Sequence, residues 1–289
     1  MSETAYKGFR LEELEFQFNP QVSVPEYPQL STERRKKCQS VREKLKFSGN
    51  VPYGDTPRQV MDIFQAGNTL APVLLYVHGG YWRGGSKDDN CNFVDLFTER
   101  GVTAAVMEYD LCPQVTVTDI VREVRSAVGW SYRNISRYGG DPSRLYIAGH
   151  SAGAHLVALA LAHDWEKEGL PRNLIKGAVA TSGVYDLDMV MHVSVNAEIR
   201  MTPDLAKKNS PYLNPPRPIC PVLVGVGGAE PDGWQRMSCD FFQLCKEEGL
   251  ECEYLVLPGA NHYSMSSHLA DPNSPLSEAI FKLMGRPAA

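Results

Sequence analysis

The chain has 289 residues, of which 43% are hydrophobic and 22% are charged. This balance is that of an ordinary globular protein and excludes a disordered, collagen-like or coiled-coil chain. The 29 Lys and Arg against 34 Asp and Glu give a net charge of −5, which does not favour nucleic-acid binding, because phosphate contacts need a basic surface.

The sequence also indicates the cellular compartment of the protein. No apolar run approaches the ~18 residues of a membrane helix, and the N-terminus lacks the basic and apolar regions of a secretory signal. The seven cysteines are an odd number without a CxxC pair, which favours reduced thiols. We therefore expect a cytoplasmic protein that does not bind membranes.

Residues 1–57 are predicted to form an N-terminal arm that packs on a single domain spanning residues 1–289. The arm is polar and helical in patches. Its charge cluster Glu33-Arg34-Arg35-Lys36-Lys37 is interpreted as the solvated face of a helix, because opposite charges follow at Glu43 and Lys44.

From residue 58 onward, short apolar runs alternate with helical periodicity. The runs predict strands at 60–64, 73–77, 102–107, 145–148, 178–180, 222–224 and 254–257, with helices at 120–135, 152–162, 241–248 and 276–284. Such alternation predicts an α/β fold whose mainly parallel central sheet has helices on both faces. Residues 186–218 interrupt it and are predicted to form a small cap insertion at the carboxyl end of the sheet, where ligands bind.

The strongest local motif is Gly149-His150-Ser151-Ala152-Gly153. It fits G-x-S-x-G and lies between a predicted strand and a predicted helix, as a nucleophile elbow requires. The small flanking residues permit the sharp turn, and the helix start favours a developing oxyanion. The sequence therefore predicts Ser151 as a nucleophile.

A serine nucleophile needs a base, and the base needs a carboxylate. His262 is the predicted base because it follows the strand 254–257, whereas His155 is expected either to be packed inside or to support the site residues indirectly. The loop after 222–224 offers Glu230 and Asp232 as the acid. We favour Glu230, because it is nearer the strand end and Pro231 restrains its backbone; Asp232 remains the alternative.

The oxyanion hole is predicted at Gly79 and Gly80, together with the backbone of Ala152 after the nucleophile. His78-Gly79-Gly80-Tyr81-Trp82 follows directly on the strand 73–77, and glycines there allow the backbone to approach a substrate carbonyl. His78 is expected to support this loop. Tyr81 and Trp82 are predicted to bind substrate as an aromatic wall, although both could simply fill the core.

Other motifs are weaker. The run from Gly225 to Glu230 resembles G-x-G-x-x-G but has Glu at the third glycine, so dinucleotide binding is not expected. No P-loop, H-E-x-x-H or zinc-type cysteine spacing occurs. We therefore predict no metal, no cofactor and a small-molecule substrate, and the oligomeric state stays open, a homodimer being one option.

These motifs together resemble the kynurenine formamidase (arylformamidase) family of α/β-hydrolases, which is related to esterases of the hormone-sensitive-lipase type. Residues 78–82 and 148–156 carry the resemblance, and Phe18-Asn19-Pro20, residues 182–187 and 209–211 extend it. It implies an α/β-hydrolase fold, Ser151 as nucleophile, His262 as base and, through alignment of 236–238, Glu230 as acid. It also implies cleavage of N-formylkynurenine to kynurenine and formate in tryptophan degradation. A small-acyl carboxylesterase is the alternative, and a catalytically inactive binding protein is disfavoured because all four site elements are present.

Overall fold

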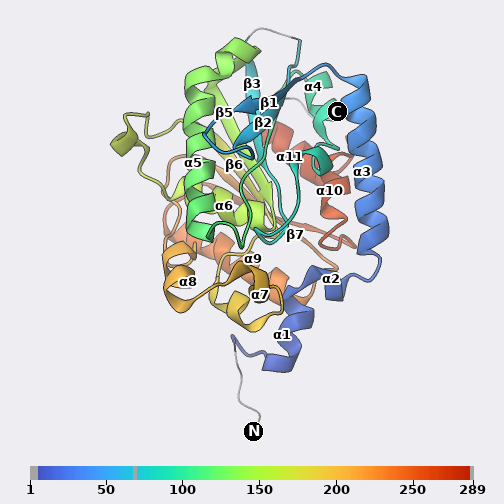
Figure 1. The fold of residues 1–289 in the computed structure, drawn as a ribbon, viewed down its shortest axis with the longest axis vertical. Coiled ribbons are helices and arrows are strands. Elements are labelled where there is room, and N and C mark those ends of the chain that lie inside the picture. The colour runs from blue at the N-terminus through green and yellow to red at the C-terminus, as the bar shows by residue number, and fades with distance from the viewer. Residues whose placement is uncertain (1–5, 68–69, 287–289) are drawn as a thin grey trace.

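The computed structural model describes residues 6–67 and 70–286. Their strands form one eight-stranded sheet in the order β1-β2-β4-β3-β5-β6-β7-β8 (Figure 1). All strands from β3 to β8 run parallel, whereas β1 and β2 form an antiparallel edge. The bounds are β1 Ser48–Pro52, β2 Val60–Phe64, β3 Ala71–Val77, β4 Thr103–Met107, β5 Gly140–His150, β6 Ile175–Thr181, β7 Val222–Gly227 and β8 Cys252–Leu257.

Helices cover both faces of the sheet (Figure 1). The helix bounds are α1 Leu11–Phe18, α2 Pro20–Ser23, α3 Tyr27–Lys44, α4 Val94–Glu99, α5 Val117–Asn134, α6 Ala152–Leu161, α7 Asn196–Ile199, α8 Pro203–Asn209, α9 Asp232–Glu247, α10 Met265–Leu269 and α11 Pro275–Leu283. Among the described residues, no helix is long and apolar enough to cross a membrane.

The central strand β3 shows why helices cover both faces of the sheet. All seven of its residues are buried. Because successive side chains of a strand point to opposite faces, Val73, Leu75 and Val77 pack into one core with α5, α6 and α9, while Leu74 and Tyr76 pack into a second core with α3, α4 and α11. A continuous apolar run is thus the expected signature of a strand buried on both faces.

The predicted mainly parallel α/β architecture is confirmed, and every predicted strand and helix overlaps an observed one. The sequence analysis interpreted residues 33–37 as a helix face, which lies within α3, but it did not predict the full length of α3 and it missed β1. α3 runs for 18 residues along one side of the domain, and β1 adds an antiparallel strand to the edge of the sheet. The described part of the arm, residues 6–57, therefore contributes a strand to the sheet as well as packing on the domain.

Candidate active site

The turn between β5 and α6 lifts Ser151 above the sheet. Its backbone has φ 57° and ψ −122°, a strained conformation for a residue with a side chain. A Cβ on Gly149 would lie 2.5 Å from the backbone of Gly153, and a Cβ on Gly153 would lie 2.0 Å from the carbonyl oxygen of Val77. Only glycine fits at both positions, which explains the G-x-S-x-G spacing.

The side chain of Ser151 contacts the predicted base, His262, which in turn contacts the favoured acid, Glu230. The Oγ of Ser151 lies 2.9 Å from Nε2 of His262, and Nδ1 of His262 lies 2.7 Å from Oε2 of Glu230. All three residues are buried. The chain order Ser151, Glu230, His262 is the order predicted for nucleophile, acid and base, and each residue follows the carboxyl end of a strand: β5, β7 and β8.

Glu230, and not Asp232, is the carboxylate on the imidazole. Its other oxygen, Oε1, accepts hydrogen bonds from the backbone N–H of Gly227 at 2.8 Å and from the hydroxyl of Ser182 at 2.5 Å. Asp232 instead begins α9, is 68% exposed and pairs with Arg236 at 3.5 Å. Ser182 was not identified from the sequence as part of the site, because nothing local marks it as a partner of a residue 48 positions away.

Two aromatic rings pack against the imidazole of His262. The ring centroids of Trp234 and His150 lie 4.4 Å and 4.6 Å from it. Burial, followed by the neighbouring charge of His262, lowers the pKa of His150 well below its ordinary value. His150 therefore stays neutral and adds no positive charge beside the imidazole of His262. Neither Trp234 nor this role of His150 was predicted.

The loop after β3 brings backbone amides towards Ser151. A Cβ on Gly79 would lie 2.8 Å from the carbonyl oxygen of His150 and 3.1 Å from Cβ of Ser151, and a Cβ on Gly80 would lie 2.1 Å from the carbonyl oxygen of Gly84. Gly80 also has φ +123°, which other residues rarely adopt. Ala152 begins α6, where backbone N–H groups lack helical partners. Gly79 and Gly80 therefore line the cavity beside Ser151, and Ala152 directly follows Ser151 at the start of α6.

Buried polar contacts of His78 stabilise the same loop. His78 lies fully buried, with Nε2 2.9 Å from Oε1 of Glu108, and its ring stacks on Tyr109. Burial alone would raise the pKa of Glu108, but the hydrogen bond and charge of His78 and the charge of Arg58 lower it below its ordinary value. His78 thus supports the loop, as the sequence analysis expected.

The predicted aromatic wall of Tyr81 and Trp82 is wrong for Trp82. Both residues have positive φ, 52° and 56°, which turns Trp82 under the loop, where it is fully buried and donates from Nε1 to Nδ1 of His155 at 3.2 Å. His155 in turn lies 2.8 Å from the carbonyl oxygen of Asn209, and so it is packed inside as expected. Tyr81 does border the cavity, and its hydroxyl donates to the carbonyl oxygen of Phe18 at 2.5 Å.

A cavity of about 270 Å³ opens above Ser151. We call its lower side the sheet floor, made of Gly79, Gly80, His150, Ser151 and His262. We call its outer side the arm wall, made of Gln21, Tyr27, Ser31, Arg34 and Arg35 from the N-terminal arm.

Residues 186–218, the predicted cap, contribute no residue to this lining. Within this segment, the 3-10 helix η4 (Asp188–His192) lies beside α1, and α8 lies beside α5. Two residues of the segment contact the lining: Glu198 pairs with Arg83 at 2.5 Å, and Oγ of Ser194 accepts from the side-chain amide of Asn19 at 3.4 Å. The arm, not 186–218, forms the wall over Ser151.

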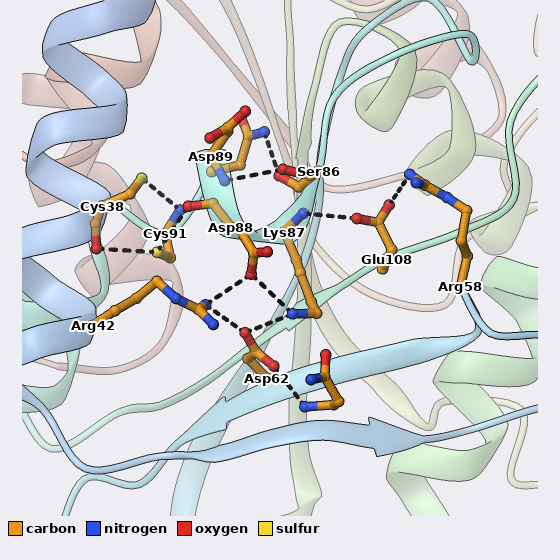
Figure 2. Close-up of polar contacts among 12 residues, drawn as sticks. Cys38, Arg42, Arg58, Asp62, Ser86, Lys87, Asp88, Asp89, Cys91 and Glu108 are labelled. Atoms are coloured by element: carbon orange, nitrogen blue, oxygen red, sulfur yellow. Dashed lines mark hydrogen bonds and ion pairs between the residues drawn. The ribbon is translucent and has the colours of Figure 1, made fainter.

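The arm is fastened to the loop after β3 by buried charges (Figure 2). Arg42 of α3 pairs with Asp62 of β2 at 2.5 Å, and the buried Lys87 pairs with the same carboxylate at 2.9 Å. Asp88 also contacts both cations. The backbone N–H of Lys87 donates to Glu108 at 3.1 Å, so this network continues to His78 and the oxyanion loop.

Within residues 6–67 and 70–286, no group of three or more His, Cys, Asp or Glu side chains is arranged to hold a metal ion. All seven cysteines are free thiols.

Comparison with known proteins gives consistent relatives. The BD-FAE family model matches residues 61–211. A kynurenine formamidase of Salmo salar is 31% identical over 245 residues, covering 82% of each chain. An isoprenylcysteine alpha-carbonyl methylesterase of Arabidopsis thaliana is 35% identical over 251 residues, 77% of this chain and 57% of that protein. A crystal structure from Silicibacter sp. TM1040, provisionally described as a thioesterase, superposes with a TM-score of 0.80 at 26% identity over 91% of this chain and 97% of the other. The chain therefore has the predicted α/β-hydrolase fold and is a hydrolase.

Proposed function

Because the chain belongs to the kynurenine formamidase family of α/β-hydrolases, we propose that it is a serine hydrolase that cleaves an aryl formamide such as N-formylkynurenine to kynurenine and formate. The observation that carries this proposal is the buried hydrogen-bonded series Ser151–His262–Glu230, with distances of 2.9 Å and 2.7 Å. The proposal places the reaction in tryptophan degradation in the cytoplasm.

In the acylation half, Oγ of Ser151 attacks the formyl carbon while Nε2 of His262 takes the hydroxyl proton. Glu230 holds the imidazole by Nδ1–H and stabilises the imidazolium. The oxygen of the tetrahedral intermediate becomes negative and accepts hydrogen bonds from the amides of Ala152 and the Gly79–Gly80 loop. The C–N bond then breaks, His262 returns its proton to the leaving amine, and formyl-Ser151 remains.

In the deacylation half, a water molecule loses a proton to His262 and attacks the formyl ester. The second tetrahedral intermediate uses the same amides and collapses to formate, and the proton returns to Oγ of Ser151. The enzyme is restored, and one water has been consumed for each formamide cleaved.

The cavity favours a compact substrate. Its volume of about 270 Å³ is slightly below the ~300–1,000 Å³ of sites that hold drug-sized ligands. The rings of Tyr27 and Tyr263 stack at 5.3 Å along its side and offer a flat apolar surface to an aryl group. This pair takes the place of the predicted Tyr81–Trp82 wall.

A small-acyl carboxylesterase is the second candidate, favoured by the methylesterase relative. The same series of side chains would serve an ester, whose leaving alcohol needs less protonation than an amine. The discriminating experiment compares kcat/KM for N-formylkynurenine with that for p-nitrophenyl acetate and butyrate. We expect the formamide to be preferred by orders of magnitude, and a preference for the esters would establish the second candidate instead.

A further inference from the structure

One cation in the cavity has no partner. Arg34 borders the cavity, is half-buried, and its Nε is buried without a hydrogen-bond partner. No carboxylate within residues 6–67 and 70–286 forms an ion pair with it. Half-buried arginines are normally paired, because an uncompensated charge out of water is costly.

The other charges in the lining are already satisfied. Arg35 pairs with Asp89 at 3.7 Å, and Arg83 pairs with Glu198 at 2.5 Å. Asp89 is the one acidic residue in the described lining. Three arginines therefore face one aspartate in a chain whose net charge is −5, and Arg34 is the cation left for a ligand.

Helix geometry explains why Arg34 differs from its neighbours. Tyr27, Ser31 and Arg34 follow one another four and three residues apart, so they share one face of α3. The same face continues to the buried Cys38, whose Sγ accepts from the backbone of Cys91 at 3.2 Å (Figure 2). Glu33, Lys36 and Lys37 lie on the exposed face. The charge cluster is a solvated face, as predicted, except at Arg34.

A stacked aromatic pair connects α3, the helix that carries Arg34, to the residue next to His262. Tyr263 directly follows His262, and its ring stacks on Tyr27, one turn before Ser31 on the helix that carries Arg34. The charge of Arg34 also contributes, after burial and His262, to the lowered pKa of His150, so its field reaches the sheet floor.

We infer that Arg34 binds a carboxylate of the substrate, and that the enzyme selects aryl formamides carrying an anionic side chain over neutral ones. A guanidinium presents a planar fork of donors that matches a carboxylate in two hydrogen bonds. With the formyl group at Ser151 and the ring along Tyr27 and Tyr263, the amino-acid carboxylate of the substrate extends towards α3. This inference rests on the proposed function and adds the group that determines specificity.

The test compares N-formylkynurenine with the same molecule whose carboxylate is converted to a primary carboxamide. Arg34→Gln should raise KM for N-formylkynurenine about 10- to 100-fold, the range for a hydrogen bond to a charged group, and change kcat much less, because the contact is equal in ground and transition states. The preference for the carboxylate over the carboxamide should fall by the same factor.

Two further variants sharpen this result. Arg34→Lys keeps the charge but loses the fork, so it should recover part of the preference. Lys36→Gln removes one positive charge from the exposed face of the same helix and should leave the preference unchanged. Equal losses on both substrates in Arg34→Gln, or an unchanged preference, would overturn the inference.

A binding measurement separates this inference from the proposed function. Titration calorimetry measures the Kd of kynurenine and of kynurenine amide for two proteins, the Ser151→Ala variant and the Ser151→Ala, Arg34→Gln double variant. This measurement needs no turnover. A carboxylate preference that depends on Arg34 supports the inference even if N-formylkynurenine is not hydrolysed. Equal binding of the two compounds to the Ser151→Ala protein contradicts it.

Discussion

The sheet floor and the arm wall border the same cavity but are positioned by different forces. The floor depends on backbone packing. A Cβ added to Gly79, or to Gly153 two residues after Ser151, would lie only 2.0–2.8 Å from a carbonyl oxygen, and the backbone of Ser151 is strained. The wall depends on side chains of α3, which is fastened through Arg42, Asp62 and Lys87. Close backbone packing tolerates almost no displacement, whereas a helix held by ion pairs tolerates substitutions along its face.

This difference suits the two tasks that we propose. Chemistry needs atoms held within a few tenths of an ångström, and a floor fixed by the sheet supplies that. Selection of a substrate needs one well-placed charge, which a helix from the arm supplies. Floor variants should therefore lose kcat, and arm variants should change KM.

The largest expected effect is on the floor. Ser151→Ala should lower kcat by ~10⁴-fold or more, leaving only the acceleration by the oxyanion hole and binding. Thermal melting should be unchanged, because Ala fits the same turn as Ser. A variant that retained a tenth of the activity would rule out Ser151 as the nucleophile.

The two acidic residues of the β7–α9 loop form a matched pair for the next test. Glu230→Gln should lower kcat by ~10³- to 10⁴-fold, since the amide favours the wrong tautomer of His262. Asp232→Asn should stay within about twofold of the parent, because Asp232 is exposed and pairs with the exposed Arg236. The reverse ranking in steady-state kinetics would reassign the acid.

The junction between arm and floor should be sensitive to loss of Lys87. Lys87→Met leaves the buried Asp62 with Arg42 as its remaining cation, so we expect the free energy of unfolding to fall by about 2 to 4 kcal/mol. The matched control is Lys37→Met, which breaks the more exposed pair with Asp95 and should cost less than about 1 kcal/mol. Equal losses in denaturant unfolding would show that the buried network does not fasten the arm.

The smallest effect concerns Glu123, a carboxylate that, unlike Glu108, forms no ion pair with any cation in the described part of the chain. Burial raises the pKa of Glu123 to about 7, although the backbone N–H of Asp110 donates to it. The folded state therefore holds a proton that the unfolded state releases above about 4.5, so this group's contribution to stability falls as pH rises from about 4.5 to 7.

Glu123→Gln copies the protonated form at every pH. It should stabilise the protein by about 2 kcal/mol at pH 8 and have little effect near pH 4.5. Thermal melting of both proteins across this range checks the difference, and a pH-independent difference would contradict the raised pKa.

The floor could be predicted from the sequence because its signals are local. A strand, a glycine-flanked serine and a helix stand within about fifteen residues, and the acid and base each follow a buried strand. The choice of Glu230 over Asp232 also followed from position, since Glu230 is nearer the end of the strand; the structure places Asp232 at the start of α9.

The arm wall could not be predicted in the same way. α3 buries only Ser31, Cys38 and Val41, so it lacks the apolar stripe that reveals which face of a helix is covered. Its orientation comes from contacts with residues 20 to 60 positions away, such as Asp62 and Asp95. The prediction for Trp82 was wrong for another reason. The positive φ values of Tyr81 and Trp82, which direct the Trp82 side chain into the core, cannot be recognised from the sequence.

The most direct test of the central claim is labelling by an aryl phosphonate, which forms a covalent bond only with an activated nucleophile. We predict one adduct per chain by intact mass, located on Ser151 by peptide mapping, with N-formylkynurenine hydrolysis lost in proportion to labelling and no adduct on Ser151→Ala. An adduct on another residue, or full hydrolysis by the labelled protein, would contradict the account.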